Sequence, residues 1–206
     1  MDKLIVTIDG PSGSGKSTLA KLLACREGFF YIDTGALYRS IAYLFSTKPT
    51  PRELDKLSVL WKKVNTEYHL FVSNRDMEPY IRGEEIGKNA SIIAKLPFVR
   101  RFVNSVVREN VNRGKYVVEG RDVGSVIFPE AQVKIYLQAD LKERAMRRAK
   151  ELHVQKDMIL DKIKERDEKD ITRKDSPLVI PEGAHVIDTT NKTQEKVYTE
   201  VISLLK

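Results

Sequence analysis

The feature that most constrains this chain is a glycine-rich segment between an apolar run and a helix-forming run. Residues 10–17 are GPSGSGKS, which matches the pattern G-x-x-x-x-G-K-[S/T] at every required position. LIVTI (4–8) precedes the segment and TLAKLLA (18–24) follows it, which predicts a strand, a tight loop and a helix. Glycine is needed in such a loop because successive backbone N–H groups must turn inward around a phosphate. The segment therefore predicts a phosphate cradle at a helix N-terminus, whose partial positive charge adds to the attraction.

We expect this cradle to hold the phosphates of ATP. Lys16 is expected to reach the β- and γ-phosphates and to act in catalysis, and the Ser17 hydroxyl is expected to ligate Mg²⁺. A GTPase is not indicated, because residues 191–194 are NKTQ and lack the aspartate of the N-K-x-D guanine motif. The length of 206 residues favours a small-molecule kinase over a motor ATPase. The predicted ATP-binding residues are Gly10, Pro11, Ser12, Gly13, Ser14, Gly15, Lys16, Ser17 and Thr18.

Short apolar runs rich in β-branched and aromatic residues recur along the chain. Most are continuous rather than alternating, as expected for parallel strands that are buried on both faces. Between them, apolar residues recur at steps of three and four over residues 99–111 and 193–206, which predicts helices. We therefore predict an α/β chain with the P-loop NTPase fold, a five-stranded parallel sheet with helices on both faces. The predicted strands are LIVTI (4–8), FFYI (29–32), YVV (116–118), VKIYL (133–137) and HVI (185–187).

One stretch that interrupts this alternation predicts an insert over residues 47–97, which begins near two prolines. YHLFVS (68–73), the turn-like NRDMEP and then YIRGEEI (80–86) predict two antiparallel strands of a small sheet. Trp61 and Phe71 are expected in the core of the insert. Cys25, on the helix after the cradle, is expected in the main core.

A second unusual stretch, residues 142–174, is helical in propensity and very rich in charge. Two weakly packed helices that could move as a lid are expected there. Residues 1–46, 98–141 and 175–206 then remain as the core domain. The thin apolar stripe of the lid consists of Met146, Leu152, Met158, Ile159 and Ile163.

The charge balance indicates an anionic partner. The formal net charge is +7, from 36 Lys and Arg against 29 Asp and Glu. Nucleic acid is a weaker reading than a phosphorylated small molecule, because residues 142–174 contain no Phe, Tyr or Trp on which bases could stack. No apolar run approaches a membrane span, and the five or six apolar residues near the N-terminus are too few for a secretory signal. With a single cysteine and no disulfide framework, a cytoplasmic protein without a membrane partner is expected.

Three further motifs are more specific than the cradle. They are DTGALYR (33–39), EGRDVG (119–124) followed by VIFP, and KERDEKD (164–170) followed by Arg173. Together with the cradle they resemble the bacterial cytidylate kinases, and the likeness runs over about residues 4–205. The resemblance implies transfer of the γ-phosphoryl group of ATP to CMP or dCMP with Mg²⁺. It also implies that the insert binds the nucleoside monophosphate and that the protein is a monomer.

The resemblance implies a role for individual residues as well. Arg39, Arg121 and Arg173 match arginines for the acceptor phosphate, which suits a planar fork of donors that keeps its charge. Ser91, Arg100 and Asp122 match the positions that select cytosine, whose amine would face a carboxylate or a hydroxyl. The implied CMP-binding set is Thr34, Tyr38, Arg39, Ser91, Arg100, Arg121, Asp122, Arg166, Asp170 and Arg173.

Arg166 is also expected to contact the transferring group, with help from Arg144, Arg147 or Arg148. Asp170 could accept a hydrogen bond from a sugar hydroxyl. Glu119 departs from the aspartate that is common at its position in the family, and we leave it out of the predicted site.

Several alternatives stay open at this point. Another acceptor such as UMP, dTMP or shikimate would suit a kinase of the same fold, and a nucleic-acid-binding protein is a remote alternative. Each arginine could lie on the surface without a function, and Asp122 could be a helix N-cap. The sequence does not decide between CMP and dCMP.

Overall fold

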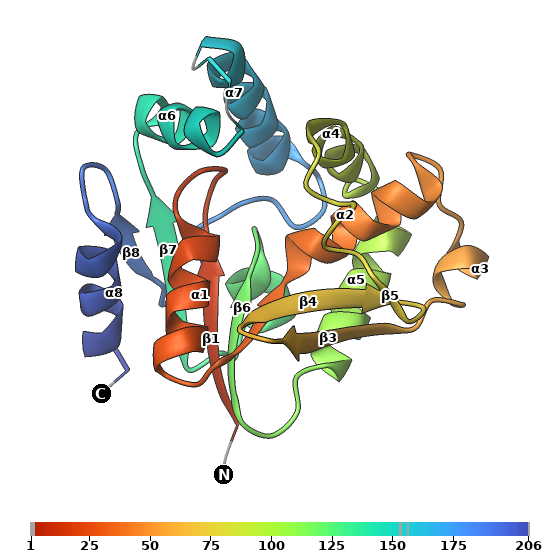
Figure 1. Ribbon diagram of the computed structural model, residues 1–206, viewed down its shortest axis with the longest axis horizontal. Coiled ribbons are helices and arrows are strands. Elements are labelled where there is room, and N and C mark those ends of the chain that lie inside the picture. Colours follow the sequence, from red (N-terminus) through yellow and green to blue (C-terminus); the bar gives the residue numbers. More distant parts are fainter. Residues whose placement is uncertain (1–2, 153, 156, 206) are drawn as a thin grey trace.

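The computed structural model describes residues 3–152, 154–155 and 157–205 of the chain (Figure 1). Its main sheet has five parallel strands in the order β2-β6-β1-β7-β8, so β1 lies at the centre. The predicted fold class and all five predicted strands are confirmed. The strands are β1 (Leu4–Asp9), β2 (Phe30–Asp33), β6 (Lys115–Glu119), β7 (Val133–Gln138) and β8 (His185–Asp188).

Helices cover both faces of this sheet because successive strand residues point to opposite sides. On β1, Val6 belongs to a cluster that α1 (Lys16–Arg26) and α8 (Gln194–Ser203) complete on one face. Ile5 belongs to the opposite cluster, together with residues of α2 (Thr34–Phe45) and α5 (Pro97–Glu109). Burial on both faces explains why the strands are continuous apolar runs.

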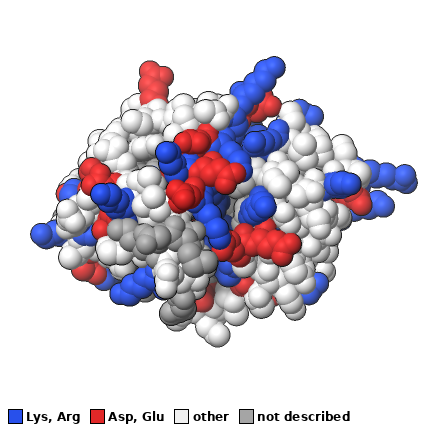
Figure 2. Space-filling view, turned by 90° about the horizontal axis from the view of Figure 1, so that it is seen from above, with Lys and Arg blue, Asp and Glu red and all other residues white. Residues whose placement is uncertain are grey.

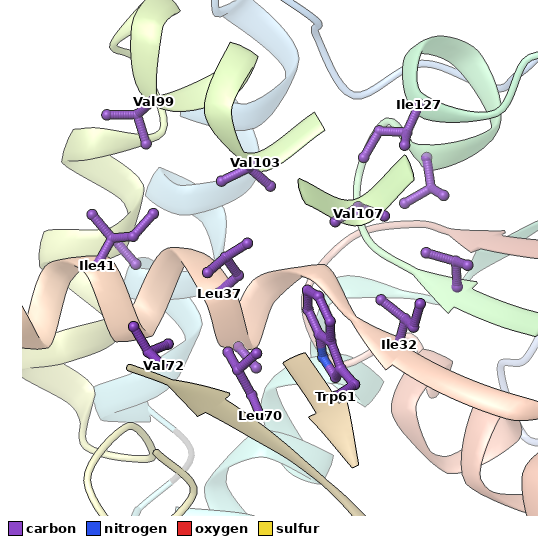
Figure 3. Packing of buried hydrophobic residues seen from close by; sticks show 14 of the residues in the cluster. Ile32, Leu37, Ile41, Trp61, Leu70, Val72, Val99, Val103, Val107 and Ile127 are labelled. Carbon is purple, nitrogen blue, oxygen red and sulfur yellow. The ribbon is translucent and has the colours of Figure 1, made fainter. Parts of the chain in front are cut away.

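The second cluster confirms the valine stripe predicted over residues 99–111. Val99, Val103 and Val107 of α5 are fully buried, while Phe102 and Val106 pack at the edge of the cluster. Figure 3 shows the three buried valines among residues from α2, the main sheet and the insert. Because such buried side chains each contribute about 1.5–3 kcal/mol, α5 anchors the part of the chain that follows the insert.

The insert contains a small antiparallel sheet, but one of its predicted strands is wrong. YIRGEEI (80–86) is no strand: Gly83 precedes α4, and Glu84 and Glu85 form its first turn, where acidic side chains complement the helix dipole. The sheet partner lies upstream, where β3 pairs with β4 through a turn at Asn65, with φ of 56°. The elements of the insert are α3 (Pro51–Leu54), β3 (Val59–Val64), β4 (Glu67–Val72), β5 (Arg75–Asp76) and α4 (Glu84–Ile93).

The insert has no separate core of its own. Trp61 is only 3% exposed and packs in the same cluster as the sheet residue Ile32 and the α2 residue Leu37 (Figure 3). Phe71 is only half-buried, so its predicted core position is wrong. The antiparallel sheet is thus fastened to the main domain by Trp61 and its neighbours.

Two helices, α6 (Leu141–Leu152) and α7 (Asp157–Thr172), lie above the cradle in Figure 1. Ile159 and Ile163 pack against Ala145 and Ala149, and Leu152 lies at the edge of this cluster. Met146, placed in the stripe by the sequence, is 49% exposed instead, because the alanines on its helix face α7. The side chain of Met158 lies outside the described part.

Cys25 is a further correction, because its side chain is exposed. The buried face of α1 is formed by Leu19, Ala20, Leu23 and Ala24, and the next residue turns out of that face toward solvent. Within the described residues, no helix is long and apolar enough to cross a membrane.

Candidate functional site

A cleft of about 1010 Å³ opens between the cradle, the insert helix α4 and the lid helices. It lies at the carboxyl ends of the strands, the usual position of a ligand site in an open parallel sheet. Figure 2, seen from the lid side, shows Lys and Arg side chains gathered with Asp and Glu along the middle of this face. Of the predicted residues, the cleft is lined by Ser12, Gly13, Ser14, Gly15, Lys16, Ser17, Thr18, Thr34, Tyr38, Arg39, Ser91, Arg121, Asp122, Arg166, Asp170 and Arg173.

Three predicted residues do not line the cleft. Gly10 and Pro11 form the base of the cradle, and Arg100 lies behind the wall, 3% exposed. Gly10 has φ of 145°, and a Cβ there would lie 2.1 Å from the carbonyl oxygen of Leu137. No larger residue could occupy this position without displacing β7. The glycine is therefore explained by the close approach of two strands as well as by the bend.

Lys16 begins α1, and its ammonium group folds back over the loop. Its Nζ donates to the carbonyl oxygen of Pro11 at 2.7 Å. Burial, and next the positive charge of Arg121, lowers the pKa of Lys16 to about 7. The group thus lies in a site where another positive charge is unfavourable and an anion is favourable.

Glu119 ends β6 directly opposite the start of α1. Its Oε2 accepts a hydrogen bond from the hydroxyl of Ser17 at 3.0 Å, and its other oxygen accepts one from Tyr31. Burial raises the pKa of Glu119, and the negative charge of Asp33 adds to the effect. The glutamate left out of the predicted site therefore belongs to it geometrically, because its additional methylene still allows contact with Ser17.

Asp33 organises the start of α2. It caps the helix by accepting from the amide of Ala36 at 2.9 Å, and it pairs with Arg39 at 2.8 Å. Burial opposes the ionisation of Asp33, but the guanidinium groups of Arg39 and Arg82 outweigh it and hold its pKa below the ordinary value. Arg82, an insert residue that sequence reasoning missed, lies 3.8 Å from the same carboxylate. Arg39 is thus held at the cleft wall rather than free on the surface.

Asp170 of α7 connects two of the predicted arginines. It accepts from Nε of Arg121 at 2.8 Å and lies 3.6 Å from Arg173. Arg121 also donates to the carbonyl oxygen of Gly10 at 2.9 Å, so it spans the lid and the cradle. Burial works against the negative charge of Asp170, but the charges of Arg121 and Arg166 prevail and lower its pKa.

Asp122 is not a helix N-cap, although a short π-helical turn, η1 (Val123–Ile127), follows it. The amides of Val123 and Gly124 donate to Asp9, at 2.8 and 2.7 Å, so β1 supplies the cap. Asp122 is consequently available to bind Arg100 and, at 3.2 Å, Arg173.

The Asp9 interaction was missed, although an acidic residue directly before a phosphate cradle was visible in the sequence. Asp9 is fully buried, and burial raises its pKa to about 6 despite the two amide donors.

Arg166 differs from the other predicted arginines. Its buried Nε has no hydrogen-bond partner within the described residues. Its Nη1 lies 3.9 Å from where a Cβ on Gly87 of α4 would be, so the guanidinium reaches from the lid to the insert. Burial, and next the charge of Arg121, lowers the pKa of Arg166 to about 10. A guanidinium held among like charges without its full set of acceptors suits an anionic ligand.

The remaining predicted residues form the inner wall. Thr34 donates its hydroxyl to the carbonyl oxygen of Glu119 at 2.8 Å, and Ser91 donates to that of Gly87 at 3.2 Å. The hydroxyl of Tyr38 is buried without a hydrogen-bond partner within the described residues. The ring of Tyr38 lies 5.8 Å from the guanidinium of Arg100. These side chains offer a half-polar pocket beside the arginines.

Arg144, Arg147 and Arg148 were predicted to help contact the transferring group. All three bind protein groups, and Arg147 lines the cleft as well. Arg147 donates to the hydroxyl and the carbonyl oxygen of Thr189, at 2.9 and 2.7 Å. Arg144 pairs with Asp167 and is only 8% exposed. Arg148 lines the cleft and pairs with Glu151 at 2.7 Å. The alternating charges of the lid gave no signal that distinguished these three arginines.

A family model described as cytidylate kinase matches residues 6–206. The chain belongs to the cytidylate kinase family. Proteins with that name from Pseudothermotoga lettingae and Fusobacterium nucleatum are 40% and 41% identical to this family member. The matches cover 99% and 96% of this chain, and 95% and 94% of the respective relatives.

A crystal structure of a gluconokinase from Sinorhizobium meliloti has a TM-score of 0.50 at 15% identity, over 98% of this chain and 91% of that one. This likeness shows the fold alone. The resemblance predicted from the motifs is confirmed at the level of the family. The chain is a nucleoside monophosphate kinase whose family activity is the phosphorylation of CMP or dCMP by ATP.

Proposed function

We propose that the chain binds ATP at the cradle and CMP or dCMP at the arginine wall, and transfers the γ-phosphoryl group directly between them. The observation that carries this assignment is a group of three cations that line the same cleft. Lys16, Arg121 and Arg166 all line this cleft, and, in addition to burial, the charges of Arg121 and Arg166 lower the pKa of Lys16 while that of Arg121 lowers the pKa of Arg166. Two phosphorylated molecules that repel each other need such a cleft in order to meet end to end.

The donor side of the site is assigned to residues 10–18. Backbone amides and the N-terminus of α1 would bind the β-phosphate, and Lys16 would contact the β- and γ-phosphates. Bound phosphates would restore the ordinary pKa of Lys16 and keep it protonated. This part of the site needs little backbone reorganisation, because Gly10, Gly13 and Gly15 already have positive φ angles.

A divalent cation fits beside the cradle by the chemistry of the available donors. Ser17 and Glu119 present a hydroxyl and a carboxylate in mutual contact at 3.0 Å. Within the described residues there is no group of three or more His, Cys, Asp or Glu that could hold a metal alone. Mg²⁺, which keeps several waters and phosphate oxygens as ligands, suits two protein ligands of this kind. When bound, the cation would neutralise charge on the transferring group.

The acceptor side of the site is assigned to segments of the core, the insert and the lid. Arg39, Arg121 and Arg173 would exchange part of their carboxylate contacts for the acceptor phosphate. Asp170 would then be available to a sugar hydroxyl. The base would enter the pocket of Thr34, Tyr38 and Ser91, with the Asp122–Arg100 pair at its wall. A carboxylate that faces the cytosine amine favours CMP over UMP.

The lid, residues 142–174, would complete the site by closing over both nucleotides. Arg166 would contact the transferring group, because it already reaches from α7 to α4 without a full set of acceptors. Closure would also exclude water, which limits hydrolysis of ATP in place of transfer. In this arrangement residues 47–97 act as the monophosphate-binding insert, and the remaining segments form the core.

An acceptor panel tests the proposal. ADP release from ATP is measured with CMP, dCMP, UMP, dTMP and shikimate in turn, each at the same concentration. We expect rapid turnover with CMP and dCMP and much slower turnover with the others, because UMP and dTMP lack the cytosine amine and shikimate lacks both the base and the acceptor phosphate. Preference for UMP, dTMP or shikimate would contradict the acceptor assignment. Salt-dependent binding of an oligonucleotide without CMP-stimulated turnover would instead favour the remote nucleic-acid alternative.

A further inference from the structure

One buried ion pair in the lid lies outside the roles assigned so far. Arg144 of α6 pairs with Asp167 of α7, and each residue is only 8% exposed. A buried pair of charges loses its hydration, and its own attraction does not reliably compensate for this loss. Such a pair needs additional hydrogen bonds, so its other contacts reveal what the pair holds in place.

Both members contact the backbone of the cradle at the same residue. Asp167 accepts from the amide of Ser12 at 3.4 Å, and Arg144 donates to the carbonyl oxygen of Ser12 at 3.1 Å. Arg144 also donates to the carbonyl oxygen of Ala139, at 2.9 Å, just before its own helix. The pair therefore joins the peptide groups of the cradle to the first turn of α6 and to the middle of α7.

The backbone of α6 contacts the same turn of the cradle. A Cβ on Gly13 would lie 2.8 Å from the carbonyl oxygen of Arg144. The positive φ of Gly13, 75°, is thus accompanied by a close approach of the lid. Backbone packing and the ion pair act at adjacent residues, 12 and 13.

The neighbour of Asp167 on α7 is Arg166. Consecutive side chains on a helix point about 100° apart, so fixing one of them fixes the direction of the other. With Asp167 held against Ser12, Arg166 is directed across the cleft to Gly87. The rotation of α7 about its own axis is therefore set by the contact between Asp167 and Ser12. Ser12 belongs to the cradle, which is the proposed site of the ATP phosphates.

We propose that Arg144 and Asp167 are positioning residues, a clamp that holds the lid on the cradle and aims Arg166 at the transferring phosphoryl group. The clamp rests on the proposed role of Arg166 and on the assignment of ATP to the cradle. Its two charges have separate tasks. The carboxylate of Asp167 sets the direction of α7, and Arg144 cancels a negative charge that would otherwise repel the phosphates of ATP beside Ser12.

A double-mutant cycle separates these two tasks. In Asp167→Asn the neutral amide oxygen accepts more weakly from Ser12 and the ion pair with Arg144 is lost, so α7 is held less firmly and kcat should fall about tenfold with little change in the KM for ATP. In Arg144→Met the carboxylate is left uncompensated, so the KM for ATP should rise about tenfold or more. In the double variant the KM for ATP should return toward the wild-type value while kcat stays low. A general loss of stability would not produce this recovery.

The matched control is Glu165→Gln, which neutralises a carboxylate on the other side of Arg166 whose partner is the exposed Lys169. Hydrogen exchange supplies a readout that does not depend on activity. The amide of Ser12 should exchange faster in Asp167→Asn than in the wild type, whereas Glu165→Gln should leave it unchanged. Equal effects of Asp167→Asn and Glu165→Gln on kcat and on exchange of the Ser12 amide would overturn the clamp. Additive effects of Asp167→Asn and Arg144→Met on the KM for ATP would also overturn it.

If Asp167→Asn unfolds, Asp167→Glu keeps the charge and moves it outward by one methylene. We then expect a folded protein with a normal KM for ATP and a lower kcat, because α7 is displaced. Wild-type kcat in a folded Asp167→Glu variant whose Ser12 amide exchanges faster than in the wild type would overturn the clamp. The proposed function would fail differently: wild-type protein would not transfer phosphate to CMP, or Arg166→Ala would turn over normally.

Discussion

The cradle and the acceptor wall both bind phosphate in our proposal, yet they are built in opposite ways. The cradle is one continuous segment, and its polarity comes from backbone amides and the N-terminus of α1. The acceptor wall combines side chains from distant segments, and Arg39, Arg121 and Arg173 each contact a carboxylate. Local backbone makes a site that is rigid before its ligand arrives. Paired side chains make a site that exchanges internal partners for ligand, which suits selection among acceptors.

The largest effect should follow removal of the one side-chain charge in the cradle. Lys16→Met keeps the aliphatic stem and the helix but removes the ammonium group from the transferring phosphoryl. We expect kcat to fall about a thousandfold, because a preorganised charge at the reacting group is lost. Steady-state kinetics of ADP release measure the change, and the matched control is Lys21→Met on the same helix. Loss of less than about tenfold would show that the amides suffice without the lysine.

Arg166→Ala should have the next largest effect. This variant tests whether the acceptor wall also needs a charge from the lid for catalysis. Because Arg166 lacks a full set of acceptors, its removal should leave the fold intact. We expect kcat to decrease about a hundredfold, with a smaller change in the KM values for both nucleotides. Thermal unfolding provides the control for stability, and a normal melting curve with near-normal kcat would remove Arg166 from the mechanism.

The two regions also differ in how far the sequence predicts them. The cradle and all five strands were predictable, because each is a short continuous run whose residue types indicate its conformation. YIRGEEI (80–86) was wrongly predicted as a strand because Tyr80 and Ile81 at its start are typical of strands. Its second half is the beginning of a helix, since Gly83 precedes α4 and two glutamates form the first turn. Cys25 was misplaced for a similar reason, since an apolar neighbourhood does not reveal which side of α1 faces the sheet.

The partners of the site residues were not predictable from the chain. No spacing pattern indicates that Asp9 caps η1, or that Asp122 pairs with Arg100 instead of capping a helix. Both contacts join segments more than twenty residues apart, and they arise only when β1, β6 and α5 are packed together. A motif can therefore identify a charged residue as part of the site, but its ion-pair or hydrogen-bond partner is known only from the packed structure.

Asp122→Asn sharpens the comparison by testing selection rather than rate. Asparagine presents an amide to the base, which fits uracil better than a carboxylate does, so the ratio of kcat/KM for CMP over UMP should fall about tenfold. Arg100 would also lose a buried partner, which should lower the free energy of unfolding by about 3–5 kcal/mol. Arg39→Met is the control, because it should weaken both acceptors alike. An unchanged ratio would exclude Asp122 from base selection.

The pKa of Lys16, about 7, predicts that ATP binding is coupled to proton uptake. Below pH 6 the lysine is already protonated in the free protein, so it should take up no proton. At pH 8 it is mostly neutral when free and protonated when phosphates are bound, so binding should take up nearly one proton. Calorimetry at pH 8 in two buffers of different ionisation enthalpy measures this number. Uptake that persists in Lys16→Met would assign the proton to another group.

The smallest effect should come from the ion pair between Lys162 of α7 and Glu84 of α4, at 2.5 Å. It connects the lid to the insert, as the clamp connects the lid to the cradle, but both side chains are about half exposed. Water and salt screen such a pair, so Lys162→Met should lower the free energy of unfolding by less than about 1 kcal/mol. Chemical denaturation and kcat measure the outcome. Because this pair also joins the lid to another segment, a large loss of kcat here would mean that any such connection aims the lid, whether or not it is buried against the cradle.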